Sequence, residues 1–293
     1  MFYFLSLLMG ILISVMIAVN GGLTNEYGVY SATIIIHTVG LILITAAVRY
    51  KKERFFPGNI PWFLYLGGAI GVFTTVANNL SFGRISVSAI LALGLLGQSV
   101  TGLVIDQFGL MGMPKHPFTK DKILGLTLIL AGIASMINSF EILAVVVSFL
   151  AGFAIIMSRT LNAKLANVTS VSVSTFYNYF VGLIVAILVF ALLGRGEIVL
   201  TEFALSPRWY IYLGGALGVT VVFLSNIVVV KISAFYLTLL IFVGQVFSGV
   251  LIDAFISQAI SVRNIVGGVL VAVGLSINLV IDYKKPKESP KEA

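Results

Sequence analysis

The sequence predicts an all-α integral membrane protein with ten transmembrane helices, arranged as two inverted five-helix repeats. Three observations predict this fold: an apolar composition, a succession of long apolar runs and an internal duplication. Of the 293 residues, 59% are hydrophobic and only 10% are charged, whereas soluble domains have roughly 45–50% and about 25%. A soluble fold could not bury so much apolar surface, so lipid has to cover part of it.

Composition also excludes several classes of function. The chain has no cysteine, which excludes disulfides, iron–sulfur clusters and thiolate zinc sites. It contains no phosphate-binding Gly-Lys loop, HExxH motif or Cys/His cluster, so neither a cofactor, a metal nor enzymatic activity is expected. The net charge of +7 does not indicate nucleic-acid binding, because the basic residues gather in short segments between the apolar runs. Residues 1–19 lack a basic n-region and a small-residue cleavage site, so we expect a retained first helix.

Each apolar run approaches the roughly 20 residues that a helix needs to cross the hydrocarbon core. The expected spans, in chain order, are residues 3–20, 29–49, 61–81, 86–105, 122–139, 142–160, 171–193, 208–230, 233–252 and 264–283. A membrane β-barrel would instead show alternating segments of about 10 residues. The tail 284–293 is charged and contains proline, so it is expected to be a disordered cytoplasmic segment.

The distribution of Lys and Arg predicts the orientation. With both termini in the cytoplasm, fourteen of the 18 basic residues fall in inner segments and four in outer ones. This bias favours an N-in, C-in protein of the cell membrane and an even number of spans. Arg159 is counted with the inner segments, because the sixth span is expected to end at residue 160.

The internal duplication divides the chain into a first repeat, 1–140, and a second, 141–283. Residues 62–71 (WFLYLGGAIG) return as residues 209–218 (WYIYLGGALG), with seven of ten positions identical. The same offset of 147 residues pairs Gln98 with Gln245 and Asp106 with Asp253, and an offset of 142 pairs Asn20 with Asn162.

Each repeat holds five spans, an odd number, so the second repeat must enter the membrane from the opposite face. Loop charge agrees with this inversion, because the segment 106–122 carries three lysines and its counterpart 253–263 carries one arginine. Inverted halves can exchange conformations and so open a central site to each side in turn. The alternative is that the duplication serves only as a scaffold.

Several segments, most of them containing glycine, carry a resemblance to a known family. They are Asn20 with the turn that follows, Pro61 to Gly68, Gly97 to Leu110, Pro114 to Pro117, Gly125 and Gly132. With them the sequence resembles the drug/metabolite transporter (DMT) superfamily and, more narrowly, its YdcZ-like inner-membrane exporter family. The second half keeps 209–218 and 244–253 but lacks the Pro-Lys-His-Pro loop. The resemblance implies a fused pair of five-helix units, and it names no substrate.

Gln98 and Gln245 are the leading candidates for substrate binding. Each lies near the middle of an apolar span, where an amide has to face protein or an aqueous cavity. We expect the two amides to face each other across the solute path. The alternative is that they act as interhelical hydrogen-bonding groups, worth about 0.6 kcal/mol per bond.

Further candidates are polar residues in or near the spans. His37, Tyr177 and Asn178 are interior, and for His37 the alternatives are a hydrogen-bonded structural role, which is favoured, and a proton relay. Asn79 and Asn226 lie near helix ends, where capping or hydration is the alternative interpretation. Asp106 and Asp253 each end the fourth span of a repeat, where a carboxylate opposes the helix dipole, so another contact is expected to offset it; exposed anchoring of the loop is the alternative and the favoured interpretation. The repeated Gly-x-x-x-Gly patterns, at 67–71 and 214–218, predict close helix approach.

No expected span has an acidic residue near its centre. The small multidrug exporters of the superfamily exchange protons for cations with a membrane-embedded glutamate, which has no counterpart in the first span here. This argues against proton/cation antiport and leaves a neutral or zwitterionic solute, a facilitator, or another form of coupling. The sequence therefore predicts a secondary transporter that exports a small polar or amphipathic metabolite by alternating access. A non-transporting structural or accessory membrane protein is the alternative, and a homodimer stays open.

Overall fold

The computed structural model describes residues 1–284 apart from short gaps, which are 56–57, 59, 111–119, 138–140, 198–203, 229–230, 232–233 and 258–260. The expected disordered tail and the Pro114 to Pro117 loop therefore lie outside the described residues. The described helices are α1 (Phe2–Tyr27), α2 (Val29–Tyr50), α3 (Leu66–Ser81), α4 (Val87–Phe108), α5 (Ile123–Met136), α6 (Ile142–Val168), α7 (Val171–Leu193), α8 (Leu213–Val228), α9 (Ala234–Ser257) and α10 (Val262–Lys284). Single 3-10 turns, η1 (Trp62–Tyr65), η3 (Lys120–Lys122) and η5 (Trp209–Tyr212), precede α3, α5 and α8.

The all-helical prediction is confirmed for the described residues, and each expected span overlaps one helix. Eight helices are long and apolar enough to cross a membrane, and α9 adds a shorter apolar stretch, Leu240–Ile256. The helix α5 has 14 residues, fewer than the roughly 20 of a full span.

The helix ends differ most from the sequence-based boundaries. The first and sixth spans were expected to end at residues 20 and 160, but α1 continues to Tyr27 and α6 to Val168. Both helices therefore carry polar residues, Asn20 and Asn162 among them, well inside their length. Hydropathy marks where apolar residues stop. A helix ends where the backbone leaves the helical conformation, so polar residues that face protein can still belong to the helix.

Glycines bring the helices into close contact, as the small-residue patterns predict. Gly10 of α1 faces the backbone of Gly244 in α9, and Gly152 of α6 faces the backbone of Gly97 in α4, without room for a Cβ atom at either crossing. Gly67 and Gly214 are equally tight, against the side chains of Asn162 and Asn20.

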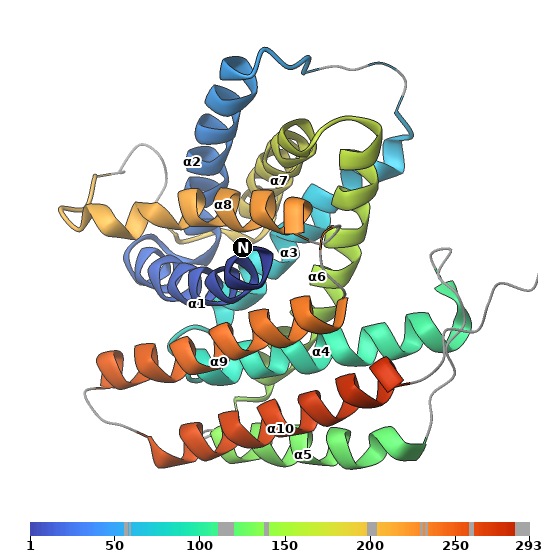
Figure 1. Cartoon of the computed structure of the whole chain (residues 1–293). Coiled ribbons are helices and arrows are strands. Elements are labelled where there is room, and N and C mark those ends of the chain that lie inside the picture. The colour runs from blue at the N-terminus through green and yellow to red at the C-terminus, as the bar shows by residue number, and fades with distance from the viewer. Residues whose placement is uncertain are drawn as a thin grey trace, which may run out of the picture.

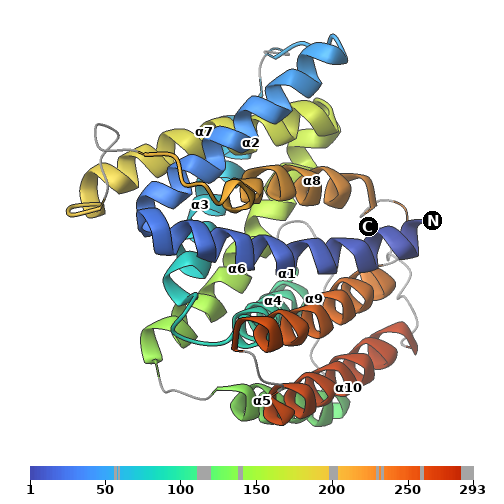
Figure 2. The ribbon, with the colours of Figure 1, turned by 90° about the vertical axis from the view of Figure 1, so that its left-hand side faces the viewer.

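The helices form two groups, one on each side of α1 (Figures 1 and 2). The helices α5 and α10 pack on each other at one side, next to α4 and α9, while α2, α7 and α8 lie on the opposite side of α1. The largest apolar cluster joins α1, α4 and α9 through residues such as Met9, Ile90 and Phe242. A cavity lies beside this cluster.

Candidate functional site

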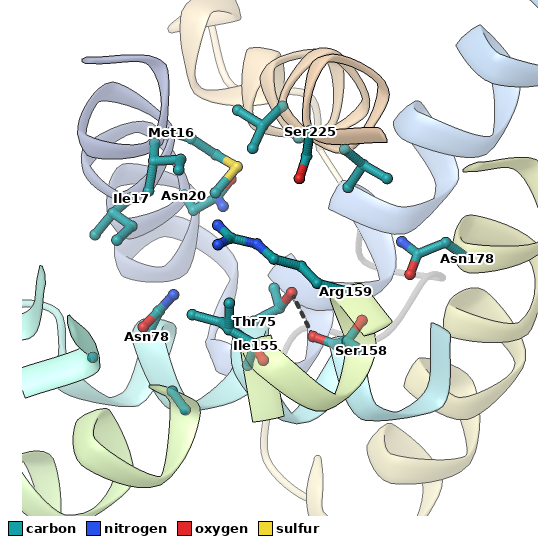
Figure 3. Close-up of a pocket in the computed structure, with 18 of the residues that line it drawn as sticks. Met16, Ile17, Asn20, Thr75, Asn78, Ile155, Ser158, Arg159, Asn178 and Ser225 are labelled. Atoms are coloured by element: carbon teal, nitrogen blue, oxygen red, sulfur yellow. Dashed lines mark hydrogen bonds between the residues drawn. The ribbon is translucent and has the colours of Figure 1, made fainter. Parts of the chain in front are cut away.

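A central cavity of about 180 Å³ is enclosed by eight helices, α1 to α4 and α6 to α9. Each half of the chain contributes four of them, and no described residue of α5 or α10 lines it. The cavity is much larger than the roughly 30 Å³ that one water molecule occupies in the liquid. It is mixed in character, because isoleucines, valines and Met16 alternate with amides and hydroxyls. Figure 3 shows side chains from α1, α3, α6, α7 and α8 converging on this space.

Five of the seven residues predicted for substrate binding line the cavity: Gln98, Gln245, His37, Asn178 and Asn226. The structure brings them together from five helices, α4, α9, α2, α7 and α8, so residues far apart in the sequence meet in one place. Their role in binding a substrate stays a prediction.

The two glutamines meet different neighbours. Gln98 accepts a hydrogen bond at Oε1 from Nη1 of Arg159 (3.3 Å) and donates from Nε2 to the carbonyl of Gly94 (3.4 Å). Gln245 is only 4% exposed, and its buried Oε1 has no hydrogen-bond partner in the part of the chain that the structure describes. Its backbone carbonyl accepts from the hydroxyl of Ser14 (2.8 Å).

His37 and Asn178 are held firmly at the wall of the cavity. Nδ1 of His37 is 2.8 Å from the carbonyl oxygen of Thr33, which can only accept, so Nδ1 carries the hydrogen. The imidazole packs on Tyr179 with ring centroids 5.7 Å apart. Oδ1 of Asn178 accepts from Nδ2 of Asn162 (2.8 Å).

The other two predicted residues, Tyr177 and Asn79, do not line the cavity. The hydroxyl of Tyr177 donates to the carbonyl of Phe55 (2.9 Å), and its ring packs on Tyr65. Asn79 is buried and donates to the hydroxyl of Thr33 (3.3 Å). Successive helical residues point about 100° apart, so Asn78 faces the cavity while its neighbour faces α2.

Arg159 is a cavity residue that the predicted end of the sixth span, at residue 160, does not indicate. Its placement in an inner segment is wrong, because α6 continues to Val168 and the side chain lines the cavity. In Figure 3 the guanidinium extends from α6 toward Asn20 of α1. A usable signal existed in the run from Thr160 to Val168, which has no glycine or proline to end a helix.

Several buried polar atoms at the cavity have no hydrogen-bond partner among the described residues. They are Oδ1 of Asn20, Oγ1 of Thr74, Nδ2 of Asn226 and Oε1 of Gln245. Buried polar groups in native proteins are nearly always hydrogen-bonded. All four atoms belong to residues that line the cavity, so unmet hydrogen-bonding capacity gathers around this one space. Among the described residues no three His, Cys, Asp or Glu side chains gather as they would around a metal ion.

Carboxylates from loops cap the helices that surround the cavity. Glu197, which follows α7, accepts from the backbone N–H groups of Val29, Tyr30 and Ser31 (2.8–2.9 Å) at the start of α2. Glu53, which follows α2, accepts from the hydroxyls of Ser170 and Ser172 at the start of α7. Because α2 and α7 pack together, these two caps lie at opposite ends of an antiparallel pair.

Asp253 has the offsetting contact that its position at a helix end predicts. Its carboxylate accepts from the backbone N–H groups of Val87 (2.7 Å) and Ser88 (3.0 Å) at the start of α4, and from Nδ2 of Asn264 (3.3 Å). A carboxylate stabilises the positive end of the α4 dipole. The side chain of its counterpart, Asp106, lies outside the described residues.

Comparisons with known proteins agree with this architecture. A family model described as "Putative inner membrane exporter, YdcZ" matches residues 1–135 and again residues 143–277. No curated protein matches the chain. Fifteen chains of solved structures match; one of them, titled "Crystal structure of protein", is 14% identical with a TM-score of 0.66, over 97% of this chain and 98% of that chain. At this identity the likeness shows the fold alone.

Proposed function

Because the chain belongs to the YdcZ family of inner-membrane exporters, we propose that it is a secondary transporter that exports a small polar or amphipathic metabolite by alternating access. The observation that carries this proposal is the central cavity, which is bounded by helices of both halves and combines apolar side chains with polar atoms that have no partner among the described residues. A scaffold protein has no need of such a space between its halves.

The internal duplication supports the mechanism. The family matches the chain twice, and each matched segment contains five helices. An odd number per repeat inverts the second copy relative to the first, which places both termini on one face, the cytoplasmic one by the charge bias. The glycine crossings come in matching pairs, α1 on α9 and α6 on α4. Equivalent contacts in two inverted halves allow the halves to exchange conformations.

The caps lie at the two ends of the α2–α7 pair, and both of these helices border the cavity. Glu197 ties the start of α2 to the loop after α7, and Glu53 ties the start of α7 to the loop after α2. Each carboxylate joins one half of the chain to the other. Release of one cap while the other holds would open the cavity toward one face only.

The substrate contacts are assigned to the predicted residues that line the cavity. Gln98 and Gln245 stand at equivalent positions, and His37, Asn178 and Asn226 supply further donors and acceptors. Asn79 and Tyr177 are assigned supporting roles, because their polar groups bond to protein. The polar groups at the wall replace water that the solute sheds when it enters.

A pair of glycine substitutions on α4 tests whether transport runs through the cavity. Gly94 lines the cavity, and a Cβ there meets only the carbonyl of Ser148, at 3.8 Å. Gly102 is on the same helix outside the cavity lining, with nothing within 4 Å of a Cβ. Gly94→Leu should fill part of the cavity and stop uptake of a radiolabelled metabolite pool into proteoliposomes. Gly102→Leu, which makes the same change in helix propensity, should transport like the parent.

Both variants should elute as monodisperse protein and unfold at similar temperatures. The transporter assignment is wrong if the parental protein catalyses no flux of any component of the pool. Flux that survives Gly94→Leu in a folded protein would place the solute path elsewhere. Either result would favour the structural or accessory alternative, or a different route through the helices.

A further inference from the structure

Arg159 is the one charged side chain among the described residues that line the cavity. It lies within α6, which continues to Val168. A guanidinium inside a membrane-spanning helix is costly unless it faces water, a partner or a ligand, and such residues mark substrate pathways. The position of Arg159 in the wall of the cavity therefore calls for a functional explanation.

The described residues satisfy only part of the hydrogen-bonding capacity of this guanidinium. Its five N–H groups form a fork that suits a carboxylate. Among the described residues its hydrogen-bond partner is the neutral amide oxygen of Gln98, at 3.3 Å. The cavity lining described here includes no Asp or Glu. The positive charge thus faces the cavity without a negative charge to balance it.

The charge belongs to one side of an otherwise duplicated site. At the offset of 142 residues that pairs Asn20 with Asn162, the counterpart of Arg159 is Ile17, which also lines the cavity. Accordingly Gln98 has a cationic partner, while Oε1 of Gln245 has none. Figure 3 shows Arg159 entering from α6 and Met16 and Ile17 on α1 across from it. The site therefore has a cation on its α6 wall, and Met16 and Ile17 give the facing α1 wall an apolar part beside the amide of Asn20.

From this asymmetry, and on the basis of the proposed function, we infer that the transported solute is an amphipathic monocarboxylate whose carboxylate binds Arg159. The guanidinium holds the two carboxylate oxygens, as arginine forks do, and Gln98 positions it. The apolar body of the solute packs against Met16, Ile17 and their apolar neighbours. A single cation suits one negative charge, and a cavity of about 180 Å³ suits a small molecule.

Sets of solutes with the same carbon skeleton test this inference by binding. The probes are butyrate, 4-methylpentanoate and 3-phenylpropionate, each with its primary amide and its α-amino acid, at pH 7.5, where the carboxylates are ionised. Binding to the purified full-length protein is measured by calorimetry and thermal stabilisation. At least one carboxylate should bind ten- to hundredfold more tightly than its amide, because hydrogen bonds to charged groups are the stronger ones. The matching amino acid should bind more weakly than that carboxylate, since its ammonium group finds no carboxylate in the lining.

Substitutions assign the effect to Arg159. Arg159→Gln should abolish the preference for the carboxylate and leave amide binding within about twofold, whereas Arg159→Lys should keep part of the preference. Arg49→Gln is the matched control, because Arg49 is exposed in the last turn of α2, outside the cavity lining. If Arg159→Gln does not fold, the solute series on the parental protein and Arg159→Lys decides the question.

Two results overturn the inference: no carboxylate binds the parent better than its amide and amino acid, or the preference persists in folded Arg159→Gln. These failures are distinct from failure of the proposed function. If Gly94→Leu blocks flux but the protein shows no preference for carboxylates, the transporter assignment stands and the monocarboxylate is removed. If the protein binds carboxylates in a way that depends on Arg159 but catalyses no flux, the monocarboxylate stands and the transporter assignment is removed.

Discussion

Gln98 and Gln245 occupy equivalent places in the two halves, yet their amides are in different states. The oxygen of Gln98 accepts a hydrogen bond from Arg159, whereas the buried oxygen of Gln245 has no partner among the described residues. The difference arises one helix away, where Arg159 in one half corresponds to Ile17 in the other. Symmetry of sequence therefore identifies the pair, and the neighbours decide what each amide can do.

Replacement of Gln245 by Leu should separate binding from stability. A buried amide oxygen without a partner costs about 1–3 kcal/mol, so Gln245→Leu should melt at the parental temperature or above it. Solute affinity should fall by up to roughly tenfold, since one hydrogen bond of about 0.5–1.5 kcal/mol is lost. Thermal unfolding in detergent and transport kinetics in proteoliposomes measure the two effects. A lower melting temperature with unchanged transport would mean that the amide only joins helices.

Gln98→Leu is the informative comparison, because it removes the protein partner of Arg159. We expect this variant to melt below the parent and to bind solute less well, as the guanidinium loses its acceptor and its orientation. Saturating solute should restore part of the lost stability by binding the native state. Equal melting temperatures for Gln98→Leu and Gln245→Leu would show that the two amides are in equivalent environments after all.

At the scale of the helices, hydropathy predicts which segments are helical but not where they end. The expected spans coincide with the helices, yet α1 and α6 run on through Asn20 and Asn162 because these polar residues face other helices. For the same reason, hydropathy does not predict that Arg159 lies within α6 and faces the cavity. The sequence could place Gln98, Gln245 and His37 inside spans, but not decide between Asn78 and Asn79, which depends on the rotation of α3.

Close glycine crossings carry a stability prediction with its own control. A Cβ on Gly152 would overlap the backbone of α4 near Gly94 and Gly97, so Gly152→Ala should force the helices apart. Overpacking of this kind typically costs about 1–3 kcal/mol. Gly102→Ala, in open space on α4, should be neutral or slightly stabilising, because alanine favours helix. Thermal unfolding of both variants measures the difference, and a fully stable Gly152→Ala would contradict the close crossing.

The helix caps predict that each face of the protein can be loosened separately. The chain has no cysteine, so Ser225→Cys gives a single reporter thiol at the cavity wall. Glu197→Ala leaves three N–H groups of α2 without their carboxylate, a loss of about 0.5–2 kcal/mol for a helix cap. It should speed labelling of the reporter thiol from the Glu197 face.

Glu53→Ala should speed labelling of the same reporter thiol from the opposite face. The measurement is the rate of reaction with an impermeant maleimide, applied to right-side-out and to inverted vesicles. If both substitutions speed the reaction from the same face, or if neither changes it, these carboxylates anchor loops and do not control access to the cavity.

At the scale of the whole molecule, the duplicated sequence predicts more than the composition does. Composition and apolar runs indicate a membrane bundle, and the repeat adds that equivalent residues of two halves should meet, as Gln98 and Gln245 do at one cavity. The repeat could not predict that α5 and α10 stay outside the lining, because both are as apolar as the helices that surround the cavity. That division follows from packing, in which Gly125 and Gly132 of α5 fit against the backbone of α10.

Inversion of the two halves makes a prediction about the faces of the membrane. Arg54 and Arg195 are exposed residues in corresponding loops, after α2 and after α7. If the repeats are inverted with both termini in the cytoplasm, Arg195→Cys should react with an impermeant thiol reagent in intact cells. Arg54→Cys should react only after the membrane is permeabilised. A cysteine at Ser289, in the tail outside the described residues, should behave like Arg54→Cys. Reaction of both loop cysteines from the same side would show parallel halves and remove the exchange of conformations on which alternating access rests.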